Sequence, residues 1–213
     1  MATYLVSIGA KFVVLSMMLH NVRITIDVPL ENRLSWVNPN DLCEETDDVV
    51  SYKIYFAATE NADFELIAEI SEATDTSFIH EPESGIAGCY AVTAIDTFFN
   101  ESRFSNVFCV DNCPKYELPN AFTPNSNGQN DRFIPYPFCF INKIELQIYN
   151  RWGEVVFTTS DPNIDWDGTN QNGDELPSGT YYYTCSVFEE RVTGIVESPV
   201  VLNGYIELIK NDR

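Results

Sequence analysis

The sequence predicts an all-β chain made of two β-sandwiches in tandem. Helical periodicity is weak throughout, and runs of alternating, β-branched or aromatic residues recur about every ten residues with turn-forming clusters between them. Twelve such runs are too many for one small sandwich. They divide at Asn112-Cys113-Pro114, because proline donates no ladder hydrogen bond and restricts the residue before it. We therefore expect domains over residues 21–113 and 114–213.

Seven runs are expected to form the first sandwich, and their alternation indicates which side chains face inward. Trp36 supplies a large inward aromatic, Tyr52 shares one face with Ile54 and Phe56, and Tyr90 shares one face with Val92 and Ala94. The expected strands are Asn21–Asp27, Arg33–Val37, Val50–Ala57, Glu65–Ile70, Thr76–His80, Cys89–Ile95 and Ser105–Val110.

Five further runs are expected to form the second sandwich. Among them, Tyr181 and Tyr183 should share one face while Tyr182 lies on the other. The expected strands are Glu117–Phe122, Lys143–Tyr149, Glu154–Thr158, Thr180–Phe188 and Tyr205–Lys210.

Residues 1–20 are interpreted as a leader or as the remnant of an upstream domain. Lys11 precedes the apolar run Phe12–Leu19, but a strong basic region and a small-x-small cleavage site are missing, so a signal peptide would be a poor one. We favour the remnant, which would make the chain a piece of a larger protein. Since no run reaches 18 apolar residues, the sequence predicts no transmembrane helix.

Composition excludes several classes of function. The 32 Asp and Glu against 12 Lys and Arg give a net charge of −20, which repels nucleic-acid phosphates and anionic lipids. Neither nucleic-acid binding nor membrane insertion is therefore expected. Six cysteines without a C-x-x-C pattern favour disulfides and an oxidising compartment over a zinc site.

The sequence offers no enzyme signature, so we expect no catalytic residues and no turnover. The chain has two histidines, His20 in the leader and His80 near Glu81 and Glu83, where a surface histidine is expected. Neither a G-x-S-x-G elbow, an H-E-x-x-H helix nor a Gly-rich phosphate loop is present. Carboxylate pairs exist, but so many acidic residues always provide them.

Residues 21–112 resemble a fibronectin type III domain. The resemblance lies in an early Trp36, a tyrosine strand over 51–56, and the strand from Cys89 to Asp96 before the turn Asn100-Glu101-Ser102. It implies a seven-strand sandwich with Trp36 and Tyr90 in its core. In that topology residue 89 lies opposite residues 109 to 111, which predicts the disulfide Cys89–Cys109, with Cys89–Cys113 as the second choice.

Cys43 has no good partner in that topology. Its inter-strand loop lies at the opposite pole of the sandwich, and Cys113 remains for it only by exclusion.

Residues 115–213 carry five motifs in a distinctive order. They are Leu118-Pro119-Asn120-Ala121-Phe122-Thr123-Pro124-Asn125 with Asn130-Asp131, then Ile148-Tyr149-Asn150-Arg151-Trp152-Gly153, Trp166-Asp167-Gly168, Pro177-Ser178-Gly179-Thr180-Tyr181-Tyr182-Tyr183, and Gly204-Tyr205-Ile206-Glu207-Leu208-Ile209. This order resembles the gliding-motility-associated C-terminal domain of Bacteroidota, the type B sorting domain of type IX secretion cargo. The sequence departs from that pattern at Asn127, where the family has Asp.

The resemblance implies an Ig-like sandwich that acts as a sorting signal. The outer-membrane type IX translocon and its associated shuttle proteins would recognise it after export to the periplasm, and the protein would reach the cell surface or the medium. The motif residues that the resemblance marks are Leu118, Pro119, Asn120, Phe122, Thr123, Pro124, Asn125, Asn130, Asp131, Tyr149, Asn150, Arg151, Trp152, Gly153, Trp166, Asp167, Gly168, Gly179, Tyr181 and Gly204.

Local chemistry suggests what some motif residues do. Asn150–Gly153 should form a hairpin turn in which Trp152 can cap the sandwich end. Arg151 should stack or pair with a carboxylate, and a contact with the translocon is the alternative. Asp167 should bind backbone N–H groups in a turn.

The loop from Asn125 to Asp131 is predicted to be a polar turn. Oxygen side chains alternate at Asn125, Asn127 and Asp131, which supports a weaker hypothesis of calcium binding, although only Asp131 is charged. No other cofactor is expected.

Cys139 and Cys185 are the two cysteines after residue 114, which predicts a disulfide between them. The leading functional hypothesis is therefore a non-enzymatic sorting module of a secreted or surface protein. The alternative is an extracellular adhesin or carbohydrate-binding module, with exposed aromatic side chains as its platform.

Overall fold

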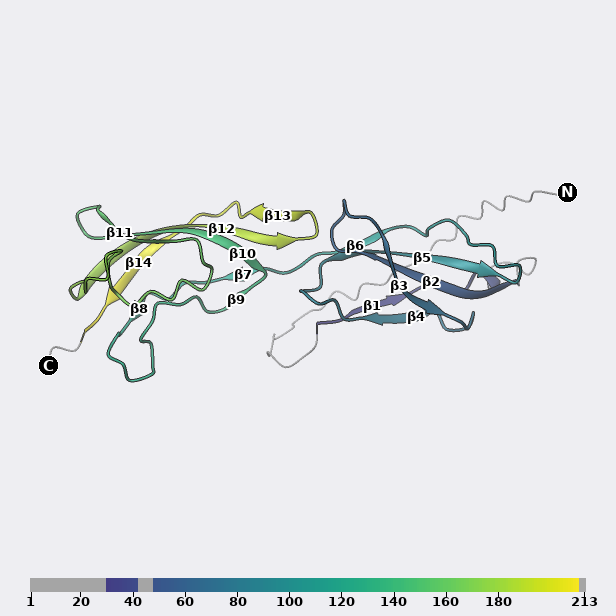
Figure 1. Cartoon of the computed structure of the whole chain (residues 1–213), viewed down its shortest axis with the longest axis horizontal. Coiled ribbons are helices and arrows are strands. Elements are labelled where there is room, and N and C mark those ends of the chain that lie inside the picture. Colours follow the sequence, from purple (N-terminus) through teal and green to yellow (C-terminus); the bar gives the residue numbers. More distant parts are fainter. Residues whose placement is uncertain (1–29, 42–47, 211–213) are drawn as a thin grey trace. The chain divides into compact units, whose positions relative to one another are not determined.

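The computed structural model describes residues 30–41 and 48–210, and the chain divides into two compact units between Asn112 and Cys113. The division lies one residue before the expected boundary. The described residues form fourteen strands and one short 3-10 helix, Pro39–Asp41, so the all-β prediction is confirmed (Figure 1). The leader over 1–20, the expected strand over 21–27 and Cys43 lie outside the described residues.

Unit 1 is a sandwich of two antiparallel sheets. A two-stranded sheet pairs β1 with β4, and a four-stranded sheet has the order β3-β2-β5-β6. The strands are β1 (Asn32–Ser35), β2 (Val49–Ala57), β3 (Glu65–Ile70), β4 (Ser77–His80), β5 (Gly88–Asp96) and β6 (Phe108–Val110). Each lies within two or three residues of a strand that the sequence predicts.

The core of unit 1 contains the aromatic residues that the sequence predicts. Trp36 and Tyr52 are buried and pack edge to face, with ring centroids 5.3 Å apart, and Tyr90 is buried beside them. The prediction of a surface His80 is wrong. Its Nδ1 lies 2.8 Å from the Tyr90 hydroxyl and its ring packs against Phe56, so burial lowers the pKa of His80.

Unit 2 is built on one large sheet with the order β11-β10-β12-β14-β8, in which β13 also pairs with β12. A second, two-stranded sheet pairs β7 with β9. The strands are β7 (Lys115–Tyr116), β8 (Ala121–Phe122), β9 (Phe138–Cys139), β10 (Ile141–Tyr149), β11 (Val155–Thr159), β12 (Gly179–Arg191), β13 (Gly194–Glu197) and β14 (Leu202–Leu208).

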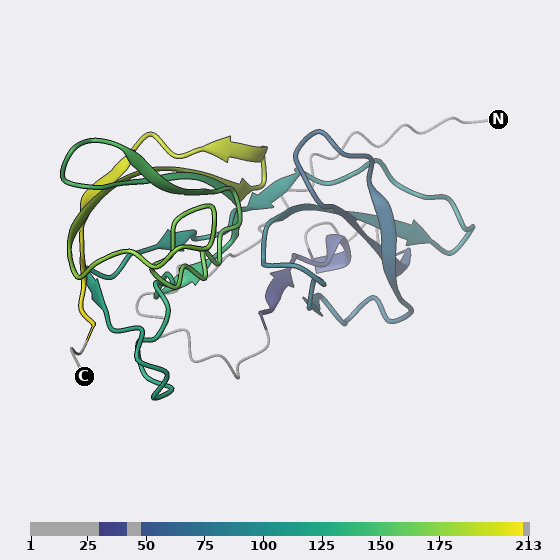
Figure 2. The same ribbon diagram turned by 60° about the vertical axis from the view of Figure 1, so that its left-hand side comes forward.

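The core of unit 2 lies between this sheet and the segments that cover its inner face. Ile144, Leu146 and Ile148 of β10 are buried, and the residues between them face outward, as their alternation predicts. Figure 2 shows the large sheet curving over the shorter strands. The expected strand Glu117–Phe122 is wrong over most of its length, since within it only β8 is a strand, and β7 ends before it and pairs in the other sheet.

Candidate functional site

The aromatic motif residues gather in the core of unit 2. Trp166 is buried and its ring lies 5.2 Å from that of Phe122 and 5.9 Å from that of Tyr181. The indole Nε1 donates to the Thr169 carbonyl oxygen at 2.7 Å, which satisfies its one polar group. Three motifs that are distant in the sequence therefore meet in one packed cluster.

The turn at Asp167 and Gly168 confirms the interpretation of Asp167. Its Oδ1 accepts hydrogen bonds from the Thr169 backbone N–H at 3.0 Å and from the Thr169 hydroxyl at 2.7 Å. These bonds lower the pKa of Asp167 against the opposing effect of burial. Gly168 has a φ of +83°, and a Cβ there would lie 3.0 Å from Leu208. Glycine therefore fits both the left-handed backbone and the small space beside Leu208.

The first motif contains β8, which joins the early part of unit 2 to β14, the last strand of the unit in the sequence. β8 pairs in parallel with β14, with Phe122 opposite Leu208, and the Asn120 carbonyl oxygen accepts the Glu207 N–H at 2.8 Å. Leu118 packs against the core. The prolines, Pro119 and Pro124, stand just outside β8, where no ladder bond is lost.

The loop from Asn125 to Asp131 is a polar turn closed by the Asp131 carboxylate. This group accepts the backbone N–H groups of Asn125 at 2.9 Å, Ser126 at 2.6 Å and Gly128 at 2.7 Å. Burial would raise the pKa of Asp131, but these bonds outweigh it and lower the pKa. Asn125 and Asn127 likewise accept backbone N–H groups of the loop.

A calcium ion would have to compete with those N–H groups for the same oxygens. Among the described residues, no group of three or more His, Cys, Asp or Glu side chains is arranged to hold a metal ion. Weak calcium binding stays a prediction. The loop also depends on Asn130, which has a φ of +52° and whose carbonyl oxygen accepts the Thr123 N–H at 2.7 Å.

Asn150 organises the turn between β10 and β11. Its Oδ1 accepts the N–H groups of Trp152 at 2.9 Å and Glu154 at 3.0 Å, and Gly153 has a φ of +81°. The Trp152 side chain is 77% exposed, so the prediction that it caps the sandwich end is wrong. Arg151 stacks instead of pairing, with its guanidinium carbon 5.1 Å from the centroid of the Trp152 ring.

The last two motifs meet where β12 pairs with β14. Gly179 begins β12, and the Tyr181 hydroxyl donates to the Pro177 carbonyl oxygen at 2.9 Å. Tyr181 faces the core while Tyr182 faces outward, as predicted. Gly204 lies opposite Tyr183, and a Cβ at Gly204 would be 2.6 Å from the Tyr183 hydroxyl oxygen, so the ring occupies the space that a side chain would need.

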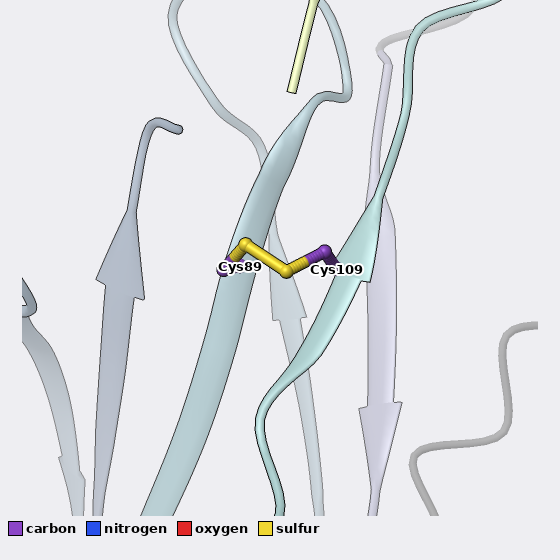
Figure 3. Close-up of a disulfide and its surroundings, with 2 residues drawn as sticks. All are labelled: Cys89 and Cys109. Atoms are coloured by element: carbon purple, nitrogen blue, oxygen red, sulfur yellow. A yellow bond between two sulfur atoms is a disulfide. The ribbon is translucent and has the colours of Figure 1, made fainter. Parts of the chain in front are cut away.

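The cysteines follow the prediction in unit 1 and depart from it in unit 2. Cys89 lies directly opposite Cys109 in the β5–β6 ladder, and the two form the predicted disulfide (Figure 3). The predicted Cys139–Cys185 bridge is wrong, since both thiols are free. Cys185 is buried in the core, which raises its pKa to about 12, whereas Cys139 belongs to the separate β7–β9 sheet.

The structure also reveals a row of tyrosines that sequence motifs alone did not single out. On the outer face of the large sheet, Tyr149 lies opposite Tyr182, and Tyr182 lies opposite Tyr205. Tyr182 and Tyr205 are half exposed. The period-two pattern places each on the outer face of its own strand, but only the register shows that the three are neighbours.

No described helix is long and apolar enough to cross a membrane. The search of curated proteins found no match. Residues 116–202 match the family described as CHU_C Type IX secretion signal domain.

Solved structures give distant likenesses. The FN1–FN3 domains of chicken CNTN1 share 10% identity, cover 83% of this chain and 60% of that chain, and have a TM-score of 0.31. The fibronectin(III)-like modules of Clostridium thermocellum CbhA share 12% identity, and the alignment covers 85% of this chain and 87% of that chain with a TM-score of 0.26. A tetra-tandem repeat of a large adhesion protein shares 11% identity, with 75% and 42% covered and a TM-score of 0.35. Likenesses at these scores carry no argument about function.

The matched segment contains four of the five motifs completely, and they are the residues that build the core and turns of unit 2. Residues 116–202 of this chain, which make up most of unit 2, are therefore similar to a type IX secretion signal domain.

Proposed function

We propose that unit 2 is a folded sorting signal, which the outer-membrane type IX translocon and its shuttle proteins recognise by its surface. The supporting observation is that most motif residues hold the fold together. Phe122, Trp166 and Tyr181 are buried in one cluster, so a partner cannot read them directly. The signal is then the shape that they maintain, and its recognition makes and breaks no covalent bond. Unit 1 travels with it as cargo or spacer.

The turn of Arg151 and Trp152 is the proposed contact with the translocon. Trp152 is the most exposed aromatic side chain of the motifs, and the Asn150 side chain fixes the backbone of the turn. A tryptophan stacked with arginine combines a large apolar area with a charge, a pairing that is typical of binding hot spots. Loss of Trp152 should therefore weaken recognition and leave the fold intact.

The test is export of a fluorescent reporter fused to residues 114–213 and directed to the periplasm of a Bacteroidota strain. Surface or medium fluorescence is expected in a strain with a working type IX translocon and not in one that lacks it. Trp152→Ala should reduce export, whereas Tyr136→Ala should not, since Tyr136 is 82% exposed and lies outside the motifs. Retention of the unmodified fusion in both strains would refute the sorting role.

A second candidate function is carbohydrate binding by the outer face of the large sheet. The three tyrosines, Tyr149, Tyr182 and Tyr205, stand on neighbouring strands and span about 10 Å, a flat amphipathic platform for sugar rings. Gln147 lies two residues from Tyr149 and Thr184 lies two residues from Tyr182. Both line a shallow trough of about 740 Å³, to which they contribute an amide and a hydroxyl group.

Affinity electrophoresis in neutral polysaccharides would test this function. We expect the chain to be retarded and Tyr182→Ala to migrate freely, with Tyr136→Ala as the matched control. Equal migration of all three proteins in every polysaccharide would exclude the tyrosine row as a saccharide platform.

A further inference from the structure

Two free cysteines come together where unit 2 begins. β7 and β9 pair in antiparallel fashion with Lys115 opposite Cys139, which places Cys113 two residues beyond this pair. The Cys139 thiol lies 3.7 Å from the Cys113 carbonyl oxygen. Cys113 is exposed and Cys139 is half-buried, so both are accessible, whereas Cys185 is enclosed in the core. Neither takes part in the Cys89–Cys109 bridge.

We propose that Cys113 and Cys139 form a second disulfide, made by exchange with a disulfide oxidant in an oxidising compartment. The exposed Cys113 thiolate attacks the oxidant and displaces one thiol, which leaves a mixed disulfide on Cys113. The Cys139 thiolate then attacks the Cys113 sulfur and displaces the second thiol. Two protein thiols are oxidised, one oxidant disulfide is reduced to two thiols, and the two protons pass to those thiols.

The surroundings support this order of attack. Burial raises the pKa of Cys139, and the neighbouring Cys113 thiolate raises it further, although the Lys115 backbone and charge oppose both effects. Cys139 is therefore the slower attacker on a dissolved oxidant. Once Cys113 carries the mixed disulfide, Cys139 is the adjacent thiol. Its proximity to the Cys113 sulfur then speeds its attack more than its smaller thiolate fraction slows it.

The bridge would fix the point at which the chain enters unit 2. Next to Lys115, Tyr116 packs against the core and its hydroxyl donates to the Pro162 carbonyl oxygen at 2.5 Å. β7 contains two residues, so few ladder bonds hold this entry segment. A covalent link to β9 would keep Tyr116 in place without requiring a longer strand.

The test is disulfide mapping of the full chain after incubation with oxidised and reduced glutathione at neutral pH. Formation of the second bridge should remove about 2 Da beyond the loss from Cys89–Cys109. Trypsin cuts after Lys53, Arg103, Lys115, Arg132 and Lys143. Peptide 104–115 carries both Cys109 and Cys113, so the peptides 54–103, 104–115 and 133–143 should appear as one joined species. Cys139→Ser should release only 133–143 and leave 104–115 joined to 54–103 through Cys89–Cys109, while Cys43→Ser should leave all three joined.

Two results would overturn the proposal. One is a folded chain in which Cys89–Cys109 has formed and Cys185 is protected, but both Cys113 and Cys139 are still alkylated by iodoacetamide. The other is a bridge from Cys43 to Cys113 in the unmodified chain. A parallel incubation in concentrated urea should give mixed pairings, which would show that the fold directs the choice of partner.

Discussion

Replacing Gly204 with alanine should destabilise unit 2, although alanine is the smallest possible change. The new Cβ would lie 2.6 Å from the Tyr183 hydroxyl oxygen and 2.8 Å from two of its ring carbons, well inside the optimal contact distance of about 3.5–4.0 Å. Overpacking of this kind costs about 1–3 kcal/mol. For a unit of this size each kcal/mol lowers Tm by about 4–8 °C.

A double-mutant cycle with Tyr183→Ala isolates the cause. Once the ring is absent the methyl group has space, and alanine is favoured over glycine in a strand by about 0.5–1 kcal/mol. The sign of the Gly204→Ala effect should therefore reverse in that background. Urea unfolding would be followed by tryptophan fluorescence in a Trp36→Phe chain, so that the signal comes from unit 2. Equal destabilisation in both backgrounds would refute the reasoning.

Four further predictions concern other parts of the chain. Trp166→Ala should cost about 3–5 kcal/mol in urea unfolding, because it empties the centre of the unit 2 core, while Trp152→Ala should cost little. Cys89→Ser with Cys109→Ser should lower the stability of unit 1 by roughly 3 kcal/mol, since the bridge closes a loop with a separation of 20 residues; an unchanged urea midpoint would contradict this. The lowered pKa of His80 means that the unfolded chain binds its proton more readily. Stability is therefore complete above the unfolded pKa and falls as the pH drops below about 6.5, a loss that His80→Phe should diminish. Because the pKa of Asp131 is lowered, its carboxylate stabilises unit 2 when the pH is above the pKa of this group in the unfolded chain, and the stabilisation is lost in acid. Thermal unfolding at pH 7 and pH 3 should show this loss in the unmodified chain, and Asp131→Asn should lack the contribution at both pH values.

Strand positions were predictable where burial alternates. β2 and β10 begin within two residues of their expected ranges, because inward apolar residues alternate with outward polar ones. β3 coincides with its expected range, although burial does not alternate along it. β7, β9 and β13 were missed. β7 and β9 contain two residues each, too few to establish a period, and burial does not alternate along β13. Within the expected strand Glu117–Phe122 only the two residues of β8 form a strand, which is again too short to establish a period.

The candidate site was predictable in its motifs and less so in its geometry. Cys89–Cys109 followed from the antiparallel strand pair that the fibronectin type III resemblance implies, and the two residues are opposite each other in that pair. The predicted Cys139–Cys185 bridge rested only on these being the two cysteines after residue 114. Membership of the same domain does not show which sheet a short strand such as β9 joins. Trp152 was expected to cap the sandwich end, but its side chain is exposed on a turn whose backbone the Asn150 hydrogen bonds fix.

The parallel pairing of β8 with β14 has a consequence for when unit 2 can be recognised. β14 lies between β12 and β8, so the large sheet stays incomplete until its last strand has been made. Phe122 and Leu208 enclose Gly168 from the two ends of the unit. A chain whose synthesis stops before β14 lacks the strand that joins β12 to β8. Under the proposed sorting role, only a chain translated through Leu208 would present the complete sheet for recognition.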